Sequence, residues 1–160
     1  MVTFNELNAI ILEHYVSFDT PDFRSIRKVM ERCPYSSLIE ELKTRWVCVE
    51  DTDVDYDVSF GFIVSLDTQY FLQLSALGRF AVLTKISPFL LNNVFVDSIT
   101  NNQKEQDLVS LLEKYGFVFL SKLLLEKHVP LTLVNIDPGC VCVYQALFSD
   151  GELPWSEKRI

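Results

Sequence analysis

The chain has 160 residues and a mass of 18.5 kDa, the size of one ordinary domain and short for two. Hydrophobic residues make up 49% of it and aromatic residues 12%, which excludes an intrinsically disordered protein. Asp and Glu total 22 against 14 Lys and Arg, and a net charge of −8 disfavours phosphate-rich partners. We therefore expect one domain over residues 1–160 that binds neither nucleic acid nor a membrane.

The first part of the chain has helical patterns. Thr3 and Glu6 have the spacing of a capping box, and apolar residues at helical spacing follow them, which predicts a helix from about residue 4 to residue 15. The triplet Thr20-Pro21-Asp22 is typical of a second helix start, and Pro34 ends that helix. A third, shorter helix is predicted directly after Pro34.

From residue 46 the period of the apolar residues changes from nearly four to two. Alternation over residues 53–65 predicts a long strand with one buried face, preceded by a strand around residues 46–48. Further strands are predicted at residues 70–77 and 80–86, with a short one at 94–96. Because the connections are short, these strands are expected to form an antiparallel meander.

The C-terminal part mixes both patterns. Residues 103–115 predict a helix, 117–120 a short strand, and 121–127 one or two helical turns. Residues 131–136 and 140–148 are expected to form two strands joined by a turn, and the last ten residues an irregular tail. The predicted fold class is α+β, with a mostly antiparallel sheet packed against helices from both ends of the chain.

The acidic residues are concentrated in one place. No Lys or Arg occurs between Trp46 and Gly78, and five of the six acids of that stretch lie within residues 50–57. Side chains two residues apart on a strand point the same way, about 6.5–7 Å apart. If Val54, Tyr56 and Val58 face the core, the intervening aspartates form an outward row suited to a basic protein partner. The candidate partner-binding residues are Glu50, Asp51, Asp53, Asp55, Tyr56 and Asp57.

Two other interpretations of this acidic stretch remain open. A solvated strand start, whose like charges discourage edge pairing, has the same composition. A calcium loop beginning at Asp51 needs glycine at its sixth position and glutamate at its twelfth, where the chain has Tyr56 and Phe62. Phe60, Phe62, Phe71 and Phe80 have the spacing of core residues. Trp155 is an interface candidate whose alternative is packing back onto the domain.

The chain shows no recognisable catalytic or cofactor motif. Its histidines, His14 and His128, have no motif that connects them to a nucleophile, and no phosphate-binding glycine loop occurs. The four cysteines lack zinc-type spacing, so we expect buried, reduced thiols, no metal and no cofactor. No signal peptide or membrane-spanning stretch is evident, and we expect a cytoplasmic protein. These cysteines are Cys33, Cys48, Cys140 and Cys142.

One resemblance concerns the C-terminal region. It runs through Leu111-Leu112-Glu113-Lys114-Tyr115-Gly116, then Leu123-Leu124-Leu125, then Val143-Tyr144-Gln145-Ala146-Leu147-Phe148-Ser149-Asp150. These segments resemble small immunity proteins of bacterial polymorphic and contact-dependent toxin systems, several of which end in a strand of the type aromatic-x-x-Leu-Phe-x-Asp. The resemblance implies a non-enzymatic cytosolic protein that neutralises a cognate toxin by binding it. The alternative is a small hydrolase or transferase whose site is assembled from distant residues around His128 and Asp137.

Overall fold

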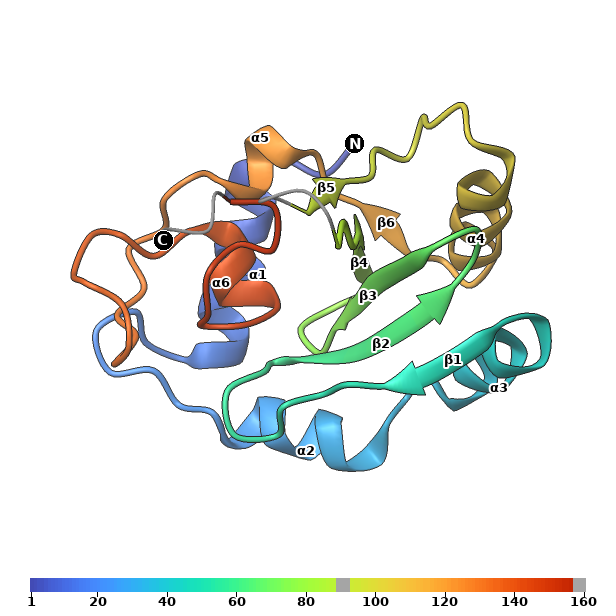
Figure 1. Cartoon of the computed structure of the whole chain (residues 1–160). Coiled ribbons are helices and arrows are strands. Elements are labelled where there is room, and N and C mark those ends of the chain that lie inside the picture. Colours follow the sequence, from blue (N-terminus) through green and yellow to red (C-terminus); the bar gives the residue numbers. More distant parts are fainter. Residues whose placement is uncertain (89–92, 157–160) are drawn as a thin grey trace.

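A six-stranded sheet forms the centre of the computed structural model, which describes residues 1–88 and 93–156 (Figure 1). The helices are α1 (Phe4–Tyr15), α2 (Arg24–Arg32), α3 (Ser36–Arg45), α4 (Gln103–Lys114), α5 (Lys122–Leu125) and α6 (Val143–Leu147). The strands are β1 (Val47–Glu50), β2 (Ser59–Ser65), β3 (Gln69–Ser75), β4 (Phe80–Lys85), β5 (Val94–Phe95) and β6 (Val118–Phe119). The α+β prediction is confirmed, and residues 157–160 of the predicted tail lie outside the described residues.

The strand order confirms the predicted meander. Strands β1 to β5 lie side by side in chain order, and each pairs with the next in antiparallel orientation. Strand β6 is the exception, because it pairs parallel to β4 after the crossover through α4. Its register places Val118 opposite Phe80. The chain therefore continues from β6 to α5 beside strand β4.

Two of the predicted helix starts have different outcomes. The capping box is present in α1, where the Thr3 N–H donates to a Glu6 carboxylate oxygen at 2.6 Å and the Glu6 N–H donates to the Thr3 hydroxyl at 3.2 Å. The second helix begins later than predicted, at Arg24 rather than at Pro21. The Asp22 carboxylate explains this shift. Asp22 was expected to be a residue of the helix, but it lies before the helix and its carboxylate accepts the Arg24 N–H at 2.9 Å, which supports the first turn.

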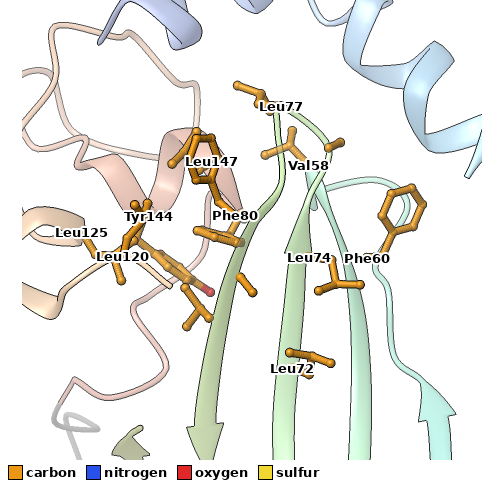
Figure 2. Close-up of a cluster of buried hydrophobic side chains, with 14 of the residues drawn as sticks. Val58, Phe60, Leu72, Leu74, Leu77, Phe80, Leu120, Leu125, Tyr144 and Leu147 are labelled. Atoms are coloured by element: carbon orange, nitrogen blue, oxygen red, sulfur yellow. The ribbon is translucent and has the colours of Figure 1, made fainter. Parts of the chain in front are cut away.

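One face of the sheet holds most of the aromatic core. Phe60 and Phe62 of β2 and Leu72 of β3 point to this face and are almost completely buried. Tyr35, which precedes α3, packs edge-on against Phe60 at 5.7 Å between ring centroids. The Tyr70 hydroxyl donates to a Glu105 oxygen of α4 at 2.6 Å. Helices α3 and α4 are therefore attached to this face. Figure 2 shows Phe60, Leu72 and Leu74 along the strands.

The opposite face is partly covered by α6. Its polar residues in β2 and β3, which alternation alone would expose to solvent, are buried beneath this short helix. The Ser59 hydroxyl donates to the Phe148 carbonyl at 2.8 Å, and the Ser75 hydroxyl donates to the Leu147 carbonyl at 2.6 Å. The Tyr144 hydroxyl bonds to the Gln73 side-chain oxygen at 3.0 Å. Hydroxyl groups of the sheet thus satisfy the free carbonyls at the end of α6.

The two strands predicted near the C-terminus are wrong. Residues 131–136 form turns without a strand, and residues 143–147 form α6, so the segment that resembles the terminal strand of immunity proteins is helical here. The Gln145 side chain accepts the Cys142 N–H at 3.0 Å and supports the first turn of α6. Seven of the eight residues from Val141 to Phe148 are buried, and such a short apolar run has no period that separates a strand from a helix.

Trp155 returns onto the domain from the C-terminal tail. Its ring meets Phe95 at 5.0 Å and Tyr144 at 5.3 Å, both edge-on. Its indole N–H donates to a Glu126 carboxylate oxygen at 2.8 Å. The interpretation of Trp155 as a packing residue is therefore confirmed, and it is not part of an exposed interface.

Candidate protein-binding surface

The acidic stretch between β1 and β2 is a turn, which we call the acidic loop (residues 51–57). The predicted strand over residues 53–65 is wrong in its first half, since β2 begins only at Ser59. The Asp53 carbonyl accepts the Asp57 N–H at 2.8 Å, and an Asp53 carboxylate oxygen accepts the Asp55 N–H at 3.1 Å. Side-chain bonds of this kind to nearby backbone are typical of aspartate in turns and compete with strand formation.

The predicted orientation of the loop side chains is corrected by this turn. Val54 is 69% exposed and Tyr56 is 55% exposed, although both were expected in the core, whereas only Val58 is buried as predicted. Asp57 was expected in an outward row but is only 8% exposed. Its carboxylate accepts the Asp53 N–H at 2.8 Å, which draws it inward. Burial raises the pKa of the Asp57 carboxyl more than its hydrogen bonds lower it.

Hydrogen bonds fix the acidic loop to β2 and to α2. The Asp51 N–H donates to the Gly61 carbonyl at 2.8 Å, and the Gly61 N–H donates to the Thr52 hydroxyl at 2.9 Å. The Arg27 guanidinium donates to the Asp55 carbonyl at 3.1 Å and also to the carbonyl of Val54. Among residues 1–88 and 93–156, no ion pair involves a carboxylate of the acidic loop. The loop backbone is therefore held in place, and no ion pair among these residues neutralises its carboxylates.

One side of the acidic loop borders an open depression of about 630 Å³, which we call the acidic depression. It lies next to α6 on the partly covered face of the sheet. In the described part of the chain, its lining holds four carboxylates and no Lys or Arg. Its carboxylates belong to Asp51, Asp53, Asp57 and Glu152, and its remaining side chains include Phe71, Gln73 and Tyr144. Glu152 was not foreseen because it lies far along the chain, in the tail.

An exposed apolar area adjoins the acidic depression on the same face of the sheet. The β1–β2 register places Val47 and Val49 on the face of Ile63, and the β2–β3 register adds Phe71 to it. Val47 is 70% exposed and Val49 is 60% exposed, while Ile63 and Phe71 are half-buried. Phe71 was predicted as a core residue, but α6 covers only the other part of this face. An apolar area beside charged groups is typical of a protein-binding surface.

The six predicted binding residues do not form one row. Asp51, Asp53 and Asp57 line the acidic depression, while Asp55 and Tyr56 border a different cavity on the other side of the loop. Glu50 is exposed, but the strand alternation places it on the opposite face from Val49. The loop therefore divides the predicted set into separate groups.

The residues considered for catalysis are not assembled into a site. His128 and Asp137 are both exposed, and neither lines the acidic depression or the cavity beside Tyr56. Of the four cysteines expected to be buried, only Cys142 is; Cys33 and Cys48 are half-buried and Cys140 is exposed, which corrects the expectation for these three thiols. Within the described ranges, no group of three or more His, Cys, Asp or Glu residues could hold a metal ion.

No described helix combines the length and the apolar character that crossing a membrane requires. Comparison of the chain with protein-family models, with curated proteins and with solved structures finds no match. The functional interpretation consequently depends on the surface itself.

Proposed function

We propose that this protein is a non-enzymatic binding module that recognises a basic protein partner, and that the partner is a toxin domain which it neutralises. The observation that carries the proposal is the acidic depression, with its four carboxylates beside the exposed apolar side chains of Val47 and Val49. Opposite charges steer association, and apolar contacts slow dissociation. The C-terminal sequence resemblance points to this class of partner, although residues 143–147 form a helix here and not the terminal strand of immunity proteins.

The rigidity of the acidic loop supports binding rather than a merely solvated turn. Its backbone is bonded to Gly61 and to Arg27, so the positions from which its carboxylates extend need little ordering when a partner arrives. Preorganisation of this kind lowers the entropic cost of association. A basic nuclease domain, whose own cations bind phosphate, has the complementary charge.

The direct test is co-expression with the C-terminal domain of the protein encoded immediately upstream of this chain's gene. We expect that domain alone to stop growth of the host, and growth to continue when this chain is present. The purified pair should form a complex whose association rate falls as salt rises from about 0.05 to about 0.5 M. Persistent growth arrest together with absence of a complex would refute the proposal.

A triple variant of the acidic depression tests the site within this experiment. Asp51→Asn, Asp53→Asn and Glu152→Gln together remove three charges while leaving the buried Asp57 intact. We expect association at low salt to slow about tenfold with a weaker salt dependence, because steering depends on these charges. An unchanged association rate would exclude the acidic depression as the contact surface.

The matched control removes the same amount of charge elsewhere. Three exposed glutamates outside the depression and the acidic loop serve for this control. They are Glu31 on α2, Glu40 on α3 and Glu113 on α4. Their combined change to glutamine should leave association almost unaltered. An equal slowing by both triple variants would show that net charge alone, and not this surface, controls binding.

A further inference from the structure

A second cavity, of about 380 Å³, lies on the other side of the acidic loop from the acidic depression. Its walls come from distant parts of the sequence: the α1–α2 connection, α2, the acidic loop, and the residues on both sides of α6. This volume is near the lower end of the range for small-ligand pockets, about 300–1,000 Å³. The cavity therefore has room for one long side chain rather than for a folded element.

Hydrogen bonds between these segments hold the cavity open. The Tyr15 hydroxyl, at its buried floor, donates to the Ala146 carbonyl at 2.7 Å. The Asn135 amide donates to a carboxylate oxygen of Asp150 at 2.8 Å, and Arg27 ties α2 to the acidic loop. Each wall is thus joined to another wall in the unbound protein, and the site is preformed.

The charge of the cavity favours a cation. Three carboxylates line it, those of Asp19, Asp55 and Asp150, against the single guanidinium of Arg27. Two backbone carbonyls already accept hydrogen bonds from that guanidinium, which partly satisfies its donors. The cavity therefore carries a formal excess of two negative charges. An incoming cation gains electrostatic energy there, because the one guanidinium of the cavity cannot neutralise all three carboxylates.

Aromatic side chains complete the chemistry. Tyr56 is exposed on the acidic loop at the rim, and Phe23 is held edge-on by Tyr15 at 5.3 Å between ring centroids. A guanidinium group is planar, stacks on aromatic rings and forms paired hydrogen bonds with a carboxylate, whereas an ammonium group does neither in the same geometry. Aromatic walls with several carboxylates therefore favour arginine over lysine.

We propose that this cavity receives the side chain of one arginine of the partner protein, as an anchor for the complex. This inference rests on the proposed binding of a basic protein, and it adds which partner residue is recognised and where. Arginine is among the residues that most often dominate binding energy when they enter a preformed pocket. The acidic depression then steers the partner, and the cavity holds it.

The test uses N-acetyl-L-arginine methylamide as the probe, followed by amide chemical shifts of the isotope-labelled chain. We expect saturable shifts around Tyr56 and Asp150 with a dissociation constant of about a few millimolar, the range of a single small side chain. The lysine analogue should bind at least fivefold more weakly, and the neutral citrulline analogue should give no saturable shifts. Equal binding of the citrulline analogue, or no saturable arginine binding, would overturn the proposal.

Two variants localise the effect. Asp19→Asn with Asp150→Asn keeps a side-chain oxygen that can accept the Asn135 bond, and it should weaken arginine binding at least fivefold with an unchanged melting temperature. Glu40→Gln with Glu113→Gln, on α3 and α4, removes an equal charge away from the cavity and should leave arginine binding unchanged. Loss of binding in the second pair instead of the first would contradict the assignment. If arginine fails to bind while the triple variant of the acidic depression still slows the partner's association, the arginine site is refuted and the proposed function is supported.

Discussion

The hydroxyl of Thr52 provides a way to disturb the acidic loop without changing any charge. It accepts the Gly61 N–H at 2.9 Å, in place of a ladder carbonyl at the end of the β1–β2 pair. Thr52→Val preserves the shape of the side chain and leaves this N–H, on a buried glycine, without its partner. A buried donor without an acceptor costs about 1–3 kcal/mol, and since Thr52 is half-buried we expect about 1–2 kcal/mol. For a chain of this length the melting temperature should then fall by about 2–8 °C.

Hydrogen exchange at Gly61 gives the decisive measurement. Its amide should exchange faster in Thr52→Val, while Thr52→Ser, which keeps the hydroxyl, should preserve its protection. Because Thr52→Val retains every carboxylate, the salt dependence of partner association should persist and dissociation should accelerate. Unchanged exchange at Gly61 in Thr52→Val would refute the idea that this hydroxyl holds the loop.

Two further predictions concern buried polar groups. Burial raises the pKa of the Asp57 carboxyl in the folded protein above its ordinary 3.8. The free energy of unfolding therefore falls as pH rises from 3.8 through the raised pKa, because the buried carboxyl must ionise over that range. Asp57→Asn, which can still accept the Asp53 N–H, should be more stable to urea than the wild type at about pH 7, with the difference shrinking toward about pH 4; a difference that grows on acidification would reverse this assignment. Ser75→Ala leaves the Leu147 carbonyl and the Leu77 N–H without a partner, and urea unfolding should show a loss of about 2–4 kcal/mol. A loss below about 0.5 kcal/mol would mean that the hydroxyl does not support α6.

The elements with a local cause could be predicted from the sequence. The α1 start follows from Thr3 and Glu6, because a capping box needs only residues three apart. The meander follows from alternation of period two with short connections, which leaves each strand beside the next. The concentration of acids in residues 50–57 is likewise visible without a structure.

Tertiary contacts decided the rest. Val141 to Phe148 is apolar on almost every side, so its helix in α6 was set by contacts with Ser59, Gln73 and Ser75 from the sheet, 70 or more residues away in the chain. The Asp57 side chain points inward because it accepts a hydrogen bond from the Asp53 N–H, and the alternation of apolar residues cannot predict this bond.

The candidate binding surface depends on the same kind of distant contact. Glu152 reaches the acidic depression only because the chain returns past α6, and Asp19 and Asp150 meet in one cavity only in the folded chain. A sequence pattern reports the period of a segment and the side on which its residues lie, but which distant segment covers that side is decided by packing. The acids could therefore be counted in advance, whereas their division between a depression and an anchoring cavity arose only on folding.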